Sequence, residues 1–126
     1  MEHVEPSIVS ASPYFVVDWP RSISTMARCK EGGKVERFEL YAGGLEIANG
    51  YTELLDPAEQ ACRFEEDNTR RQAMGKDQFS IDDEFIGALA RLDGEYSGVS
   101  IGIDRLLMAL LNKKKIGDVL PLRFTL

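Results

Sequence analysis

Residues 38–53 read FELYAGGLEIANGYTE and predict a β hairpin that carries acidic side chains. Gly43-Gly44 is a two-residue turn signal between two runs of β-type residues. Side chains alternate along each strand, so a turn at these glycines places Glu39, Tyr41 and Glu46 on the same face. The two acids are then diagonal cross-strand neighbours, with Cα atoms roughly 7–8 Å apart.

Two interpretations of these acids remain open. Like charges at this distance repel, and a divalent metal held by carboxylates and shared with substrate phosphates would relieve the repulsion. Exposed acids are also common on solvated protein faces, which is the purely structural alternative. A third acid, Glu53, follows Asn49-Gly50, where a bend or bulge can turn Glu53 toward the same face.

Residues 97–111 form a second stretch of interest and read SGVSIGIDRLLMALL. Its first part alternates, which predicts a strand whose apolar face packs on a core. The residues of that face are Val99, Ile101 and Ile103. Gly98 and Gly102 weaken a strand, so they indicate close approach of a ligand or of another backbone. An apolar helix is predicted over residues 106–111, with Asp104 as its N-cap.

Arg105 stands at the junction of this strand and this helix. Arginine suits the binding of phosphate and stacking on a flat ring. A glycine-lined strand that ends in arginine is therefore a reasonable floor for a nucleotide. The alternative is a buried strand that contains glycine, with the arginine in a capping contact.

Three segments together resemble a known family. They are EIANGYTEL at residues 46–54, DPAEQ followed by RFE at residues 56–65, and GVSIGIDR at residues 98–105. They are similar to the C-terminal part of the catalytic domain of class II lysyl-tRNA synthetases. They resemble most the truncated paralogues that lack an anticodon-binding domain, the elongation factor P–(R)-β-lysine ligases. The resemblance extends upstream to VEP and PYFVVDWP and downstream to the end of the chain.

The resemblance implies a nucleotide site. GVSIGIDR looks like the third signature motif of the family, so Gly102 would form part of the pocket floor. Arg105 would contact a bent ATP near its γ-phosphate and adenine. Glu39 and Glu46 would bind the Mg²⁺ ions that accompany ATP.

The resemblance also implies an amino-acid site, because EIANGYTEL looks like the lysine-type pocket. Glu46, Asn49 and Glu53 would line this site, and the acids would receive the ammonium groups of the substrate. Gly98 would lie on its floor. Ser100 departs from the pattern, since lysyl-tRNA synthetases look glycine-like and β-lysine ligases look alanine-like there. The choice between lysine and β-lysine therefore stays open.

The first two signature motifs of the family lie upstream of what this chain contains. The second motif supplies an arginine for the α-phosphate and part of the adenine site, and nothing before Phe38 resembles it. Residues 1–126 are therefore expected to be the C-terminal portion of a class II catalytic domain, with motif 3 present and motifs 1 and 2 absent.

Two functional hypotheses follow from the resemblance. In the first, the chain takes part in ATP-dependent activation of lysine or β-lysine as an aminoacyl-adenylate, for transfer to elongation factor P or tRNA. Without motifs 1 and 2, this ligase activity is expected to be impaired. In the second, the chain is a non-catalytic module that binds an amino acid or nucleotide or mediates an interaction.

Composition narrows the classes of partner. The 126 residues suit one domain and carry a net charge of −6, which argues against tRNA binding by this chain alone. Cys29 and Cys62 lack metal-ligand spacing and predict reduced thiols in the cytoplasm. His3 is the only histidine, so a histidine-based mechanism is not expected. No apolar run approaches the roughly 20 residues that span a membrane.

The expected fold class is α+β, a partial class II core with an antiparallel sheet of about four strands flanked by helices. The predicted elements are a strand over 14–18 and a loop over 21–35 with a helical turn near 24–28. They are followed by a helix over 57–74, a second helix that starts within residues 80–83 and runs to about Leu92, and an extended segment over 116–126. The first helix is expected to begin at the N-cap Asp56 and to turn Ala58, Ala61, Cys62 and Phe64 inward. A sheet edge left exposed predicts a homo-oligomer.

Overall fold

The computed structural model describes residues 12–23 and 26–122. His3, the VEP segment and the last four residues lie outside this range. The chain divides into two compact units. The first comprises Met1–Val17, Phe38–Gly50 and Val99–Leu126, and the second comprises Asp18–Arg37 and Tyr51–Gly98.

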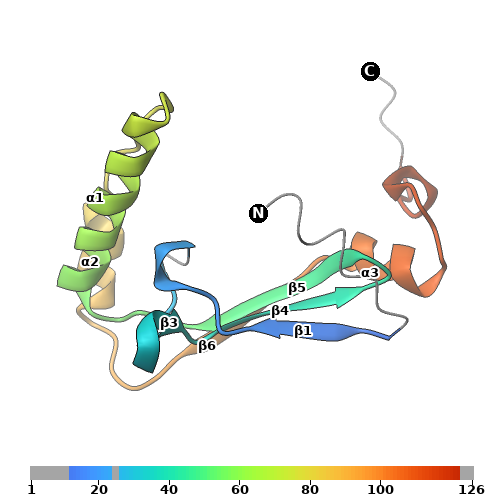
Figure 1. Cartoon of the computed structure of the whole chain (residues 1–126), viewed down its shortest axis with the longest axis horizontal. Helices are drawn as coiled ribbons and strands as arrows, with labels where there is room; N and C mark the ends of the chain where they lie inside the picture. The colour runs from blue at the N-terminus through green and yellow to red at the C-terminus, as the bar shows by residue number, and fades with distance from the viewer. Residues whose placement is uncertain (1–11, 24–25, 123–126) are drawn as a thin grey trace. The chain divides into compact units, whose positions relative to one another are not determined.

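Most of a four-stranded sheet lies in the first unit (Figure 1). Its order is β1-β4-β5-β6, with bounds Tyr14–Val17, Arg37–Ala42, Leu45–Thr52 and Ser97–Ile101. The first residue of β4, the last two of β5 and the first two of β6 belong to the second unit. β1 pairs antiparallel with β4, and Tyr14 lies opposite Tyr41. The predicted antiparallel sheet of about four strands and the α+β class are confirmed.

The hairpin between β4 and β5 turns at the two predicted glycines. Gly43 has φ +60° and Gly44 has φ +77°, the left-handed values of the two-residue turn that matches strand twist. Farther along, Thr52 N–H donates to Glu36 O at 2.9 Å. The turn alone would place Tyr51 opposite Glu36, so β5 contains one extra residue before Thr52, as in a β-bulge.

Helix α3, Ile103–Leu110, follows β6 directly in the first unit. Its N-cap is Gly102, so the prediction of Asp104 as the cap and of a start at residue 106 was wrong. Gly102 N–H donates to Ile47 O and Gly102 O accepts from Leu106 N–H, both at 2.9 Å. The same residue therefore ends the strand pairing and begins the helix. Farther on, Ile116–Asp118 form a 3₁₀ turn, η4, where an extended segment was predicted.

The apolar face of β6 differs from its prediction. All five residues of the strand are exposed, and the exposed fractions of Val99, Ile101 and Ile103 are 54%, 52% and 60%. β6 is the last strand in the order of the sheet. Among the described residues of this unit, the buried apolar side chains are instead Tyr41, Ile47, Ala48 and Met108.

The second unit contains a small sheet where a loop was predicted. The segment 21–35 holds η2 at Arg21–Ile23, β2 at Cys29–Lys30, η3 at Glu31–Gly33 and β3 at Lys34–Val35. β2 and β3 pair antiparallel. The helical turn thus lies earlier than predicted, and Ser24 lies outside the described residues. The prediction failed because strands of two residues show no alternation and depend on their partners. Both cysteines are free thiols, as predicted.

Two helices complete the second unit. α1, Pro57–Ala73, begins where predicted, because Asp56 Oδ1 accepts from the amides of Ala58 and Glu59 at 2.9 Å. α2, Asp83–Leu89, is capped by Asp82 and is shorter than predicted, since Leu92 lies beyond it and is exposed.

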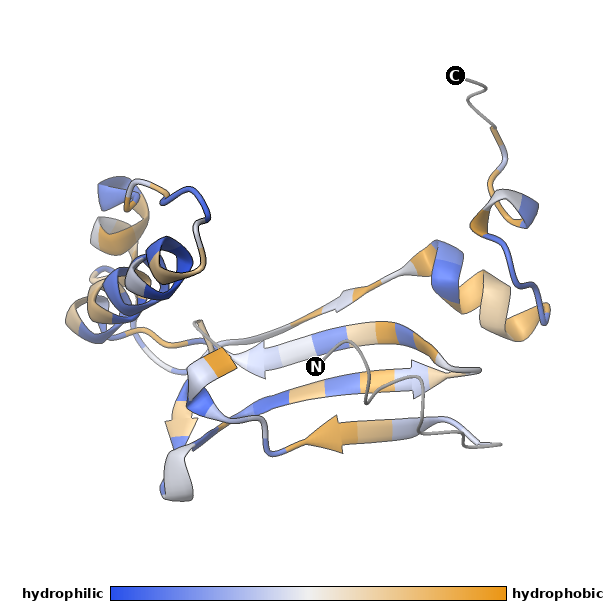
Figure 2. Cartoon of the chain, turned by 45° about the horizontal axis from the view of Figure 1, so that its top comes forward, coloured by the Kyte–Doolittle hydropathy of each residue, from blue (hydrophilic) through white to orange (hydrophobic). Residues whose placement is uncertain are grey.

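The buried side of α1 is polar. Gln60 and Arg63 are its buried residues. Of the predicted inward side chains, Ala61 and Phe64 are half-buried, whereas Ala58 and Cys62 are exposed, so the prediction was wrong for these last two. Figure 2 shows hydrophilic colouring along much of α1 and hydrophobic colouring along much of α3. The most buried side chains of α1 are therefore a guanidinium and an amide, while Phe64 contacts the Phe85 ring of α2 at a centroid distance of 6.1 Å.

Asp18, the first residue of the second unit, forms ion pairs with Lys30 and Lys34 of the small sheet, and these contacts predict a pH dependence of stability. Hydrogen bonds from Lys30 and Lys34 lower the pKa of Asp18 to about 2. A lowered folded-state pKa adds stability above the ordinary Asp value of 3.8, and this stability is lost as pH falls toward 2. Asp18→Asn should therefore lower the urea midpoint at pH 6, and the difference from the original chain should shrink by pH 2.5. Asp18 has φ +63°, which asparagine also tolerates. An equal difference at both pH values would contradict the assignment.

Candidate functional site

Glu39 is the most buried acid of the predicted site, with an exposed fraction of 4%. Tyr41 Oη donates to Glu39 Oε2 at 2.8 Å, which confirms that the two side chains share a face of β4. Tyr14 stacks on Tyr41 with ring centroids 5.4 Å apart and an interplanar angle of 7°. The carboxylate is therefore oriented by a tyrosine that is itself held by the neighbouring strand.

Arg105 and Glu46 lie together in the same unit. Arg105 Nη1 donates to Glu46 O at 3.1 Å and lies 3.7 Å from Glu46 Oε2. A Cβ on Gly102 would stand 3.6 Å from Arg105 Cδ, so the arginine stem packs against the bare backbone of this glycine. Both charged side chains are partly exposed. The structure thus brings together three of the predicted site residues at the start of α3.

Two further predicted residues lie on strands of the first unit. Asn49 is half-buried on β5, and Ser100 is exposed on β6. Asn49 follows buried Ala48, whereas all of β6 is exposed. The hydroxyl of Ser100 is therefore accessible.

Glu53 and Gly98 lie together in the second unit. A Cβ on Gly98 would stand 3.8 Å from Glu53 Oε1, so the carboxylate lies beside the glycine, with room between them for no more than a methyl group. Burial raises the pKa of Glu53 above its usual value, because the carboxylate is partly removed from water. A bound ammonium group would reverse this shift. The two residues predicted to border the amino-acid site are thus neighbours in the second unit.

Sequence reasoning placed Tyr41 on the face of Glu39 but gave it no role, and it missed Arg63. The i, i+2 spacing of Glu39 and Tyr41 was the available signal for the first. No local signal marks Arg63, because its partners are distant in sequence. No group of three or more His, Cys, Asp or Glu side chains within 12–23 and 26–122 is arranged to hold a metal ion.

A cavity of about 370 Å³ opens in the second unit beside α1 and α2. Its lining residues are Met26, Phe64, Asp67, Asn68, Phe79, Ser80, Ile81, Asp82 and Phe85. None of the predicted site residues lines it. The described helices include none with the length and apolar character needed to cross a membrane.

Comparison with known proteins gives a family. Residues 5–124 match the family described as tRNA synthetases class II (D, K and N). The elongation factor P–(R)-β-lysine ligase of Photorhabdus laumondii is 44% identical over 124 residues, which are 97% of this chain and 38% of that protein. The ligase of the same name from Proteus mirabilis is 44% identical over 119 residues, 93% of this chain and 37% of that protein. The chain thus spans about two fifths of the length of these relatives. It belongs to the class II tRNA synthetase family.

Proposed function

We propose that this chain is the C-terminal portion of a lysyl-tRNA synthetase-like catalytic domain, with motif 3 present and motifs 1 and 2 outside it. Its function is the ATP-dependent activation of lysine or β-lysine as an aminoacyl-adenylate, for transfer to elongation factor P or tRNA. The observation that carries the proposal is the 44% identity to elongation factor P–(R)-β-lysine ligases over nearly the whole chain. The contact of Arg105 with Glu46 and the proximity of Glu53 to Gly98 support it.

Different residues are assigned to the binding of the nucleotide and to the binding of the amino acid. Glu39 and Glu46 would hold Mg²⁺, which would neutralise phosphate charge. Arg105 would contact the phosphates and adenine of ATP, with Gly102 as part of the pocket floor. Glu46, Asn49 and Glu53 receive the amino acid, with Gly98 and Ser100 beside it. No covalent nucleophile is needed, because the rate comes from positioning and from charge stabilisation.

The proposed function is tested by amino-acid-dependent exchange of labelled pyrophosphate into ATP with Mg²⁺, using lysine and β-lysine in parallel. Exchange above background would support an adenylation site assembled by this chain, and the better substrate would identify the amino acid. Turnover by these 126 residues alone is expected to be low, because motif 2 lies outside them. A folded protein that neither exchanges pyrophosphate nor binds either amino acid would contradict the proposal.

The alternative proposal is a binding function without catalysis. The chain can retain the pocket residues and act as a non-catalytic module that binds an amino acid or nucleotide. Binding of lysine or ATP without exchange, even after addition of the remaining catalytic domain of a relative, would favour this alternative.

The net charge and the state of the thiols bear on the proposed binding partners and the proposed cellular compartment. Its net charge of −6 argues against binding tRNA by itself, so a small amino acid and elongation factor P are the proposed partners. Two free thiols suit the reducing cytoplasm, which is the proposed compartment.

Substitution of the two metal-binding candidates gives a direct test of the nucleotide site. Glu39→Gln and Glu46→Gln should each weaken Mg²⁺-dependent ATP binding by about 10-fold, since each removes a charged ligand worth at least ~1.4 kcal/mol. Calorimetric titration with and without Mg²⁺ measures the effect. Glu84→Gln, an exposed acid at the start of α2, is the matched control. Unchanged binding in both site variants would contradict the metal assignment.

The exposed sheet edges predict a homo-oligomer. The edge strand β1 exposes Phe15 and Val17 by 62% and 57%, and β6 at the other edge exposes Val99 and Ile101. Unpaired edges with apolar side chains add further strands readily. Light scattering should therefore give a mass above that of one chain. Ile101→Lys should lower this mass, because an edge lysine opposes pairing. A monodisperse monomer of the original chain would count against the prediction.

A further inference from the structure

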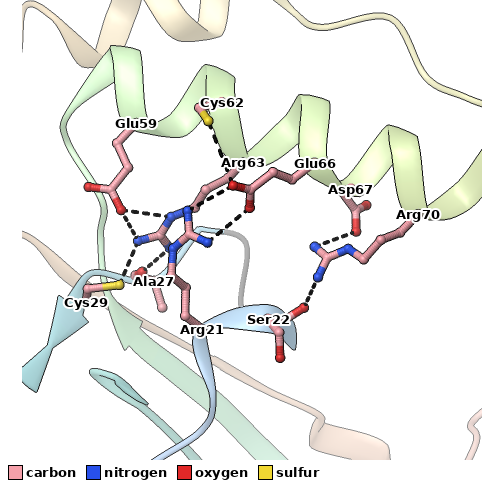
Figure 3. Close-up of polar contacts among 10 residues, drawn as sticks. All are labelled: Arg21, Ser22, Ala27, Cys29, Glu59, Cys62, Arg63, Glu66, Asp67 and Arg70. Atoms are coloured by element: carbon pink, nitrogen blue, oxygen red, sulfur yellow. Dashed lines mark hydrogen bonds and ion pairs between the residues drawn. The ribbon is translucent and has the colours of Figure 1, made fainter. Parts of the chain in front are cut away.

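Arg63 on α1 is buried, with an exposed fraction of 2%, which is rare for an arginine. Its guanidinium reaches Ala27, Cys29 and Glu59 among the described residues (Figure 3). Nη1 donates to Ala27 O at 2.7 Å, and Nη2 donates to Cys29 Sγ at 3.1 Å and to Glu59 Oε1 at 2.5 Å. Nε donates to the same Glu59 oxygen at 3.1 Å. A planar fork with several donors makes these contacts at once, which a lysine ammonium on a flexible stem cannot do.

Ala27 belongs to the segment that pairs with Glu53. The two residues form an antiparallel bridge. Leu54 N–H donates to Met26 O at 2.9 Å, and Arg28 N–H donates to Thr52 O at 2.8 Å. Residues 26–28 therefore run alongside residues 52–54, with Glu53 in the middle of the paired stretch.

The main chain of Glu53 is also held from the other side. Glu53 N–H donates to Tyr96 O at 2.9 Å, two residues before Gly98. The backbone groups of successive residues in an extended segment point in opposite directions. Residues 52 and 54 therefore form hydrogen bonds with residues 26–28, whereas residue 53 forms its hydrogen bond with residue 96. The position of the Glu53 carboxylate beside Gly98 thus depends on both neighbouring segments.

Of the two segments that flank Glu53, Arg63 holds residues 26–28. Met26 O and Arg28 N point toward 52–54, so Ala27 O points the opposite way, where Arg63 meets it. Ala27 is 2% exposed, and a buried carbonyl needs a donor. Glu59 balances the charge of the guanidinium, which lets Arg63 remain buried at this point. The contact therefore fixes residues 26–28 against α1.

We propose that Arg63 is a positioning residue for Glu53, which it acts on through Ala27. By holding 26–28, Arg63 sets the distance between the Glu53 carboxylate and Gly98 and so the size of the proposed subsite for the ammonium group. The inference rests on the proposed function for the role of Glu53 as the group that receives an ammonium of lysine or β-lysine.

Arg70 provides a matched control on the same helix (Figure 3). It also binds a main-chain carbonyl, Ser22 O, and an acid of its own helix, Asp67. The carbonyl, however, belongs to η2 rather than to the segment paired with Glu53. Arg70 is 40% exposed, so its contacts are reached by water. Substitution of either arginine would loosen α1 in general, whereas only substitution of Arg63 would move Glu53.

The test compares Arg63→Lys with Arg70→Lys in the whole chain, after circular dichroism has shown that both are folded. The first measurement is the titration of the Glu53 carboxyl carbon by NMR, which needs no ligand. Arg63→Lys should lower the pKa of Glu53 toward its ordinary value as water reaches the carboxylate, and Arg70→Lys should leave it unchanged. If Arg63→Lys fails to fold, Glu59→Gln should shift the titration in the same direction by less.

The second measurement is affinity for lysine and β-lysine, with Mg-ATP affinity as the internal reference. Arg63→Lys should weaken amino-acid binding by about 10-fold and leave Mg-ATP binding unchanged, whereas a merely structural role would weaken both. An unchanged Glu53 titration in a folded Arg63 variant, or equal shifts in the Arg63 and Arg70 variants, would overturn the inference. Failure of the original chain to bind either amino acid would instead count against the proposed function, and the titration would still decide whether Arg63 positions Glu53.

Discussion

Arg63→Met is expected to lower the free energy of unfolding by about 2–4 kcal/mol. Methionine fills much of the same volume but donates no hydrogen bond, so the buried Ala27 carbonyl loses its donor. Cys29 Sγ and Glu59 lose the same partner. Glu59 is 38% exposed and regains water, so the carbonyl and the packing around it account for most of the loss. Urea denaturation followed by circular dichroism measures the change.

The control for this prediction is Arg70→Met. Its contacts lie nearer to water, so it should change stability by no more than about 0.5 kcal/mol. A loss of equal size in the two variants would mean that α1 is stabilised along its length rather than at Arg63. Since domains of this size are stable by about 5–15 kcal/mol, the expected loss is a large share of the total.

Arg105→Ala is expected to weaken Mg-ATP binding by about 10- to 100-fold, the range for hydrogen bonds to charged groups. The guanidinium is half exposed and donates a hydrogen bond to Glu46 O at 3.1 Å, so it can turn toward a phosphate at small cost. The Mg-ATP affinity of Arg105→Lys should lie between that of the original chain and that of Arg105→Ala. A lysine still attracts phosphate as a point charge but lacks the planar guanidinium fork. Titration calorimetry with Mg-ATP measures the series.

Exposed Arg91, just after α2, is the control for Arg105. Arg91→Ala removes the same charge from the chain and should leave Mg-ATP binding unchanged. Equal weakening by the two substitutions would assign the effect to net charge. No weakening in either would remove Arg105 from the nucleotide site.

The features that sequence predicted correctly are local ones. A turn at Gly43-Gly44 and a helix start at Asp56 depend on residues within four positions of each other, so the chemistry is visible in a short segment. The strand that leads into Arg105 was predicted from alternation alone. For the site, the structure brings Arg105 to Glu46 and Glu53 to Gly98, while the roles of these residues stay predictions.

The features that sequence missed depend on distant partners. Apolar periodicity pointed to Ala61 and Phe64 as the inward face of α1, but Arg63 is buried because Ala27 lies 36 positions away with a carbonyl to satisfy. The small sheet of β2 and β3 is too short to show alternation. The start of α3 was displaced because Gly102 also pairs with Ile47.

The hairpin turn has a consequence for chirality. Both turn glycines adopt φ values that L residues avoid and that D residues prefer. D-alanine at Gly43 and Gly44, introduced by chemical ligation of a synthetic hairpin, would restrict the unfolded chain without straining the folded one, a gain of about 0.4–1 kcal/mol per position. L-alanine at the same positions would have the opposite effect. The strands that carry Glu39 and Glu46 can thus be made more rigid by mirror-image residues that lie outside both strands.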